Sequence, residues 1–128
     1  MIDLDHFKII NDQFGHDKGD KVLTLSAKHL INLRRSTDWV YRWGGEEFIC
    51  ILPDTHSEAI TSITDILHEQ FKKADWQALG IPSQTISIGV ACTRDNVNKD
   101  FETLFKEADA ALYTAKKNGR NQTVIACT

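Results

Sequence analysis

Three acidic side chains occur at two places in the sequence where a strand is expected to end. Asp3 closes a short apolar run, and Glu46 and Glu47 follow directly after the pair Gly44-Gly45. If the first strand pairs beside the hairpin that these glycines indicate, the three carboxylates lie at one end of a sheet. Carboxylates suit Mg²⁺, which commonly completes its shell with substrate phosphates, and a residue without a side chain lets a phosphate or ribose approach the turn. The same pattern alone is more typical of an ordinary hairpin whose acids face water.

Two polar side chains, Asn11 and Asp20, lie on either side of an expected turn at Gly15-His16. A guanine base offers N1–H and an exocyclic amine as hydrogen-bond donors and O6 as an acceptor. A carboxylate accepts from both donors, and an amide supplies the complementary donor. Each residue alone is more commonly a turn or helix-cap residue, so guanine recognition is one of two interpretations.

Two basic residues, Lys116 and Arg120, are four positions apart at the end of an expected helix. Two cations placed there are suited to a triphosphate, and they equally complement the negative end of the helix dipole. A second charged pair, Arg35-x-x-Asp38, is either a purine-binding pair or a surface ion pair that contributes under about 1 kcal/mol.

The composition indicates one globular domain. The chain has 128 residues, of which 41% are hydrophobic and 26% are charged. Its net charge of −3 argues against a nonspecific nucleic-acid coat, so we expect no nucleic-acid partner. No apolar run approaches the roughly 20 residues that cross a bilayer, so we expect a cytoplasmic domain without membrane contact. Cys50, Cys92 and Cys127 form no C-x-x-C pair, and we interpret them as reduced thiols.

Hydrophobic periodicity and turn residues predict an order of strand, two helices, hairpin, helix, strand, helix and strand. Asp5 is expected to cap the first helix, which Gly15 ends, and the second helix is expected from about Gly19. The spacing from Thr55 to Glu58 is that of a capping box. The remaining expected segments are a hairpin within 38–52, a strand over 84–93, a last helix around 104–117 and a strand over 123–126. This order indicates an α+β fold.

Spaced motifs along the whole chain resemble those of the GGDEF family of diguanylate cyclases. They are Asp3-Leu4-Asp5-His6-Phe7-Lys8, Asn11-Asp12, Phe14-Gly15-His16 with Gly19-Asp20, Arg42-Trp43-Gly44-Gly45-Glu46-Glu47-Phe48, Ser87-Ile88-Gly89-Val90-Ala91, and Ala108-Asp109-Ala110-Ala111-Leu112-Tyr113 through Lys116 to Gly119-Arg120-Asn121. The resemblance implies one domain over residues 1–128. It also implies a nucleotidyl-cyclase fold, polymerase-palm-like and ferredoxin-like, with a mixed, mainly antiparallel sheet and flanking helices.

The resemblance further implies that two GTP molecules are condensed into cyclic di-GMP and two pyrophosphates by metal-assisted attack of a 3′-hydroxyl on an α-phosphate. Mg²⁺ or Mn²⁺ would be held by the Asp3 carboxylate, the Leu4 carbonyl, Glu46 and Glu47. Glu46 and Glu47 are the implied catalytic acids, with Glu46 as the candidate base. The implied substrate residues are Asn11 and Asp20 for guanine, Gly44 and Gly45 against GTP, Lys116 and Arg120 for its phosphates, and Phe7 and Lys8.

The resemblance also concerns assembly and regulation. One domain binds one GTP and the product joins two, so the active enzyme is expected to be a homodimer with facing half-sites. Five residues separate Arg35-x-x-Asp38 from Gly44, which is the position of the family's inhibitory product site. There Arg35 would pair with guanine O6 and N7, as in nucleic-acid readout. Feedback by cyclic di-GMP is therefore expected.

The chain departs from the family pattern at its start. The pattern carries a helix and a Leu-Thr…Asn-Arg stretch before the first strand, whereas this chain begins at Met1 inside that strand. We therefore expect an N-terminally truncated fragment with low activity, belonging to a protein with an upstream sensory or dimerising region, such as a membrane-bound sensor. The alternative is a non-catalytic GGDEF-like module that binds GTP or cyclic di-GMP. The enzyme is favoured because degenerate members typically lose the motif acids, which are all present here.

Overall fold

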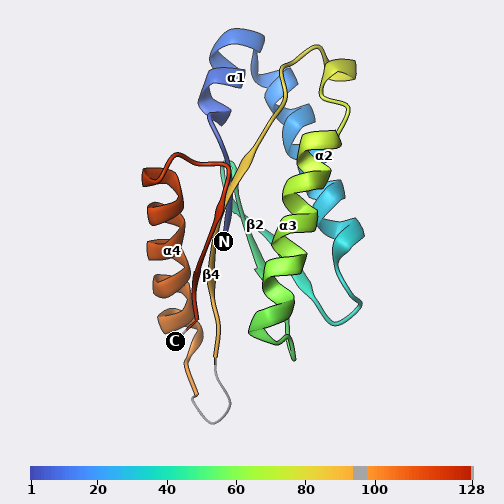
Figure 1. Ribbon diagram of the computed structural model, residues 1–128. Helices are drawn as coiled ribbons and strands as arrows, with labels where there is room; N and C mark the ends of the chain where they lie inside the picture. The colour runs from blue at the N-terminus through green and yellow to red at the C-terminus, as the bar shows by residue number, and fades with distance from the viewer. Residues whose placement is uncertain (94–97, 128) are drawn as a thin grey trace.

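The structure is a computed structural model that describes residues 1–93 and 98–127. The strands and helices follow one another along the chain in the predicted order (Figure 1). They are β1 (Ile2–Leu4), α1 (Phe7–Phe14), α2 (His16–Leu33), β2 (Trp39–Gly44), β3 (Glu47–Ile51), α3 (Ser57–Lys73), the 3₁₀ helix η1 (Gln77–Leu79), β4 (Ile86–Ala91), α4 (Phe101–Lys117) and β5 (Thr123–Ala126).

The strands form one five-stranded sheet in the order β2-β3-β1-β4-β5. The short strand β1 lies at its centre and runs antiparallel to both β3 and β4. β2 and β3 form the predicted hairpin, and β4 and β5 are the one parallel pair in the described sheet. The predicted α+β class with a mixed, mainly antiparallel sheet is therefore confirmed.

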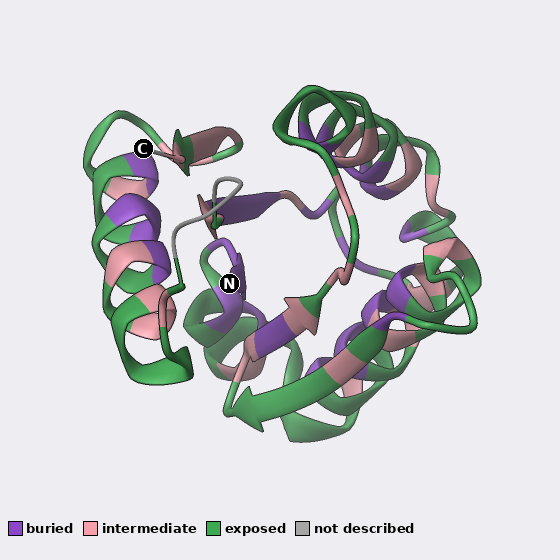
Figure 2. Ribbon diagram, turned by 90° about the horizontal axis from the view of Figure 1, so that it is seen from below, coloured by how far each residue is buried: buried purple, intermediate pink, exposed green. Residues whose placement is uncertain are grey.

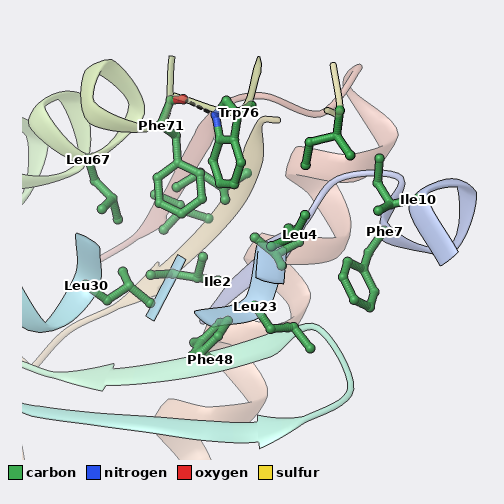
Figure 3. Close-up of a cluster of buried hydrophobic side chains, with 14 residues drawn as sticks. Ile2, Leu4, Phe7, Ile10, Leu23, Leu30, Phe48, Leu67, Phe71 and Trp76 are labelled. Carbon is green, nitrogen blue, oxygen red and sulfur yellow. Dashed lines mark hydrogen bonds between the residues drawn. The ribbon is translucent and has the colours of Figure 1, made fainter. Parts of the chain in front are cut away.

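Helices cover both faces of the sheet. Figure 1 shows α2 and α3 on one side and α4 on the other. The main hydrophobic core draws its members from β1, β3, β4 and the first three helices (Figure 3); it consists of Ile2, Leu4, Phe7, Ile10, Val22, Leu23, Leu30, Phe48, Leu67, Phe71, Trp76, Ile81, Ile86 and Ile88. The Trp76 indole completes this core by donating a hydrogen bond of 2.7 Å to the Phe71 carbonyl oxygen.

Strand alternation decides which side chains of β1 reach the site. Ile2 and Leu4 belong to the core beneath α2 and α3, so Asp3 points to the opposite face, where α4 lies. Figure 2 shows the buried side of α4 turned toward the sheet. The approach is close, because a Cβ added at Gly89 would overlap backbone atoms of Ala108 and Leu112. This close packing brings the α4 side chains within reach of β1.

Two predicted caps are wrong. Asp5 does not cap α1, whose N-cap is His6 at φ 55° with no side-chain hydrogen bond. Thr55 does not form a capping box, because the N-cap of α3 is His56 and no side chain caps that helix. Both polar side chains instead bond to groups far away in the sequence, Asp5 to β4 and Thr55 to Arg35.

Two predicted boundaries also change. Helix α2 begins at His16, immediately after the break at Gly15, rather than near Gly19. The hairpin turn consists of Gly45 and Glu46, because Gly44 still belongs to β2 and pairs with Glu47 across a register shift. Only Gly45 of the two glycines has a positive φ, 45°.

The interpretation of all three cysteines as reduced thiols is wrong for two of them. Cys92 and Cys127 form a disulfide just beyond the parallel pair β4–β5, with Cα atoms 4.9 Å apart. Cys50 is free, and burial raises the pKa of its thiol to about 11. Among the described residues, no helix has the length and apolar composition to cross a membrane.

Candidate nucleotide and metal site

The acidic residues predicted to converge do lie together at one end of the sheet. The β1–β3 register places Asp3 directly opposite Glu47. The Leu4 amide donates a 3.2 Å hydrogen bond to the Glu46 carbonyl oxygen, which draws the hairpin turn against the end of β1. Asp3 and Leu4 are both buried, and Glu46 and Glu47 are half-buried. The predicted convergence of the three acidic residues is therefore confirmed, and Leu4, which the family resemblance implied, lies with them.

Burial and mutual repulsion make this end of the sheet unfavourable for negative charge. The pKa of the Asp3 carboxyl is raised, mainly by burial, although Lys116 opposes the shift. The pKa of Glu47 is raised by burial and then by the Asp3 charge. The Lys116 ammonium donates a hydrogen bond to Asp3 Oδ2 and is its ion-pair partner. One cation already compensates the acids, and the Glu47 carboxylate has no ion-pair partner among the described residues.

These donors fit a hard divalent ion. No group of three His, Cys, Asp or Glu side chains among the described residues is arranged to hold a metal by itself. Mg²⁺ needs only one or two protein carboxylates when substrate phosphates and waters complete its octahedron. Asp3 and Glu47 supply two adjacent carboxylates in a setting that favours a cation. An ion bound at Asp3 Oδ2 would compete with Lys116, which contacts that oxygen.

A cleft of about 460 Å³ opens next to this acidic end, between α1, α2 and the hairpin turn. It is lined by Phe7, Lys8, Asn11, His16, Asp20, Leu23, Arg42, Gly45 and Glu46. The cleft unites the two residues predicted for guanine with the hairpin turn. Glu46 belongs to both regions, because its backbone also contacts β1.

Local geometry explains why the cleft forms. Gly19 lies where α1 and α2 come together, and a Cβ at this position would overlap the Asn11 side-chain oxygen and come within 3.2 Å of the Phe7 ring. On the other side of the cleft, the Arg42 guanidinium donates hydrogen bonds of 3.1 and 2.9 Å to the Gly45 carbonyl oxygen. One glycine thus positions the amide, and one arginine holds the turn.

The predicted phosphate ligands lie on the side of Asp3 rather than in the cleft. Lys116 is in the last turn of α4, and Arg120 belongs to the connection from α4 to β5. Neither residue lines the cleft, and neither does Gly44. Lys116 is joined to the acidic end by its contact with Asp3. The predicted substrate residues therefore form a cleft group and an α4 group, and the acids lie between them.

The sequence model of the family described as "Diguanylate cyclase, GGDEF domain" matches residues 1–122. The chain belongs to the GGDEF family. A curated relative of this GGDEF domain, diguanylate cyclase DgcM of Escherichia coli, is 43% identical over 126 residues. The match covers 98% of this chain and 30% of DgcM, so the chain spans less than a third of that relative.

Solved structures of GGDEF domains share the fold of this chain, which confirms the predicted palm-like cyclase architecture. The active GGEEF domain of a diguanylate cyclase from Vibrio cholerae has a TM-score of 0.87 at 37% identity, covering 97% of this chain and 78% of that one. The GGDEF domain of DgcB from Caulobacter crescentus, solved in complex with c-di-GMP, has a TM-score of 0.86 at 29% identity, covering 98% and 74%.

The predicted product-site pair of this GGDEF domain is an internal ion pair away from the cleft. The Arg35 guanidinium donates a 2.8 Å hydrogen bond to Asp38, and also bonds to the Pro53 carbonyl oxygen and the Thr55 hydroxyl, each at 2.7 Å. These contacts hold the pKa of the buried Asp38 carboxyl below its usual range. Half of the Arg35 side chain is exposed, and its hydrogen bonds to described residues use Nε and Nη2.

The sequence patterns did not predict three of the residues that line the cleft, namely His16, Leu23 and Arg42. Leu23 follows Asp20 by three positions and so shares its helix face, which is a usable signal. Arg42 stands two positions before the glycine pair, within the motif that carries the family resemblance. His16 is the first residue of α2, and it lines the cleft because the turn at Gly15 brings the start of α2 there.

Proposed function

We propose that this domain is a diguanylate cyclase that condenses two GTP molecules into cyclic di-GMP and two pyrophosphates. The single observation that carries the proposal is the continuity of the site at Glu46. This residue lines a cleft suited to guanine and also lies beside the Asp3–Glu47 pair. A nucleotide whose base occupies the cleft has its phosphates directed toward the acids and the end of α4.

The cleft supplies base recognition in this proposal. The exposed Asp20 carboxylate accepts hydrogen bonds from guanine N1–H and the exocyclic amine, and the Asn11 amide supplies the complementary donor. Phe7 and Lys8 line the wall from α1, and the hairpin turn at Gly45 allows close approach of the sugar and phosphates. Adenine presents no equivalent pair of donors, so Asp20 selects guanine.

The acidic end supplies the chemistry. The Asp3, Glu46 and Glu47 carboxylates and the Leu4 carbonyl would hold Mg²⁺ or Mn²⁺, which neutralises charge that develops on the reacting phosphate. Lys116 moves from Asp3 to the triphosphate and acts there together with Arg120. The 3′-oxygen forms its bond to the α-phosphorus as pyrophosphate leaves, and the 3′-hydroxyl proton passes to Glu46.

A homodimer follows from this chemistry. Each domain has one guanine cleft, whereas the product contains two guanosines, so two domains must present their GTP molecules to each other. Names of relatives support the reaction: DgcM is a diguanylate cyclase, and the DgcB domain was solved with c-di-GMP.

We further propose that cyclic di-GMP inhibits the domain at Arg35 and Asp38. The Arg35 guanidinium is already oriented by Asp38, Pro53 and Thr55 through Nε and Nη2, which leaves the N–H groups of Nη1 to donate to guanine O6 or N7. Arg35→Ala is expected to abolish both product binding at this site and inhibition of turnover. If Arg35→Ala leaves calorimetric affinity for cyclic di-GMP and the inhibition unchanged, the site is wrongly assigned.

The second candidate function is a non-catalytic module that binds GTP or cyclic di-GMP. The Lys116–Asp3 contact favours it, because an ammonium on Asp3 competes with a metal ion. The experiment is turnover of GTP with Mg²⁺, with pyrophosphate and cyclic di-GMP resolved by chromatography. The cyclase is expected to form two pyrophosphates for each cyclic di-GMP. A covalently fused dimer that binds GTP but forms no product would favour the binding module and reject the cyclase.

A further inference from the structure

Asp5 is a buried carboxylate that the proposed reaction does not use. It follows β1 directly, is 4% exposed, and has no ion-pair partner among the described residues. Its charge is instead satisfied by hydrogen bonds from three groups distant in the sequence. The Ser87 hydroxyl donates to Oδ1 at 2.6 Å, and the Thr85 hydroxyl and the Asn121 amide donate to Oδ2 at 2.7 and 3.0 Å.

The Asn121 amide belongs to an unusual turn. Gly119, Arg120 and Asn121 have φ values of 115°, 65° and 47°, so two residues other than glycine adopt the left-handed region in succession. L-residues disfavour this conformation, and it persists only where surrounding contacts hold it. The Arg120 amide bonds to the Ala115 carbonyl oxygen at 3.0 Å, a contact within the end of α4. Gln122 Nε2 donates to the Arg120 carbonyl oxygen at 3.0 Å, and the Ile88 amide of β4 donates to the Gln122 carbonyl oxygen at 2.9 Å. Asp5 supplies the side-chain contact to the Asn121 amide between them.

Asp3 of β1 and Asp5, which follows β1, therefore contact the two ends of one basic segment. Asp3 contacts Lys116, and Asp5, two residues later, binds the backbone next to Arg120. Hydrogen bonds to Thr85 and Ser87 of the β4 region fix the Asp5 carboxylate itself. The hydrogen bond from the Asn121 amide to Asp5 joins residues 116 positions apart. It therefore links the backbone next to Arg120 to the end of the strand that carries Asp3.

We propose that Asp5 is a positioning residue for triphosphate binding: through the Asn121 amide it fixes the left-handed turn so that Arg120 points to the phosphates. This inference rests on the proposed function, in which Arg120 holds the phosphates of GTP. Asp5 touches neither the substrate nor a metal in this role. Its loss is expected to release the turn while the guanine cleft, which Asp5 does not line, stays intact.

The test compares two ligands by calorimetry with Mg²⁺: GMP, and a GTP analogue in which a methylene group replaces the α,β-bridging oxygen. Asp5→Ala is expected to weaken binding of the analogue about tenfold, the effect of one mispositioned charge-assisted contact. Affinity for GMP should change less than about twofold, because the base contacts remain. Adding Arg120→Ala to Asp5→Ala should cause no further loss, since both changes remove the same contact.

Two further variants separate positioning from general stability. Asp5→Asn keeps an oxygen that accepts from the Asn121 amide, and its amide nitrogen can donate to Ser87, so binding of the analogue should be restored. Thr64→Val removes a buried hydroxyl that bonds to the Thr61 carbonyl oxygen, outside the contacts of Asp5, and should leave analogue binding within about twofold of wild type. Circular dichroism would establish that each variant is folded.

Several outcomes would overturn the inference. If Asp5→Ala weakens GMP and the analogue equally, or neither, Asp5 does not position the phosphate contacts. Additive losses from Asp5→Ala and Arg120→Ala would also reject it, because the two residues would then act independently. A wild-type protein that binds neither ligand would reject the proposed function as well, whereas normal wild-type turnover with no selective effect of Asp5→Ala rejects the inference alone.

Discussion

The cleft and the acidic end of the sheet meet at Glu46, yet they are built in opposite ways. In the cleft, Asp20 is exposed and Asn11 half-buried, and the space between α1, α2 and the turn is open. At the acidic end, Asp3 is 3% exposed and its carboxylate already pairs with Lys116. One region is ready for a ligand, whereas the other is closed by an internal contact.

The two regions differ in whether a ligand has to displace an existing contact. A purine base can enter the cleft without displacing any described contact of Asn11 or Asp20. A metal ion at Asp3 Oδ2, or a triphosphate that binds Lys116, competes with the Lys116–Asp3 contact. A metal ion also offsets the burial and the Asp3 charge that raise the pKa of Glu47. Base binding and phosphate binding are therefore expected to respond to different substitutions, and the following predictions test this separation.

The largest effect is expected from Glu46→Gln, which keeps the size of the side chain and removes its charge. Turnover should fall by about 10²- to 10³-fold, because the acidic end loses a metal ligand and the candidate base. GMP affinity should stay within a few-fold of wild type. Glu58→Gln, an exposed change at the start of α3, is the matched control. Undiminished turnover by Glu46→Gln would contradict its assigned role.

A smaller effect is expected from Asp20→Asn in the cleft. The variant can no longer accept from both guanine donors, so the preference for GMP over AMP should fall by about 10- to 100-fold. Competitive binding of the two nucleotides measures this ratio. Asp17→Asn, an exposed change one turn earlier in α2, should leave the ratio unaltered. A retained preference in Asp20→Asn would place base recognition elsewhere.

Lys116→Ala should act in opposite directions on two ligands. Removal of the ammonium frees Asp3, so Mn²⁺ affinity of the nucleotide-free protein should rise several-fold, while affinity for a triphosphate falls by a similar factor. Electron paramagnetic resonance of Mn²⁺ measures the first effect and calorimetry the second. Lys117→Ala, the exposed neighbour, should change neither. A fall in Mn²⁺ affinity would show that Lys116 does not compete with metal.

The smallest effect concerns His68, which lies outside both regions and contacts Thr123 Oγ1 at 2.9 Å. Burial lowers the pKa of this imidazole, although Asp65 and Asp5 oppose the shift. The unfolded chain therefore binds a proton at a higher pH than the folded protein does. Stability should decline as the pH falls below about 6.5, the ordinary pKa of histidine. Urea titrations should show a flatter decline in His68→Gln; an equal slope would assign the decline to other groups.

Local patterns predicted most of the fold, because each element carries its own period and turn residues. The strand at Thr123–Ala126 and the hairpin around Gly45 were predicted in this way. The misplaced caps show the limit of local patterns. Asp5 lies one residue before the N-cap of α1, and donors from Thr85, Ser87 and Asn121 hold its carboxylate.

The site was predictable in its residue types and only partly in its contacts. The pairing of Asp3 with Glu47 depends on β1 lying beside β3, which was a condition of the prediction rather than part of it. The Lys116–Asp3 contact joins residues 113 positions apart and depends on how closely α4 packs on Gly89. The Cys92–Cys127 disulfide likewise depends on the parallel register of β4 and β5, which no cysteine spacing encodes.

The most direct test of the account is the initial rate of cyclic di-GMP formation from GTP and Mg²⁺, measured over a wide range of protein concentration. Two facing half-sites predict a rate that rises with the square of protein concentration while the domains are mostly monomeric, and linearly once they have dimerised. Formation of cyclic di-GMP in strict proportion to protein, at concentrations where sedimentation shows the domains to be monomeric, would contradict the shared site. Absence of cyclic di-GMP at every concentration, in the fused dimer as well, would contradict the cyclase itself.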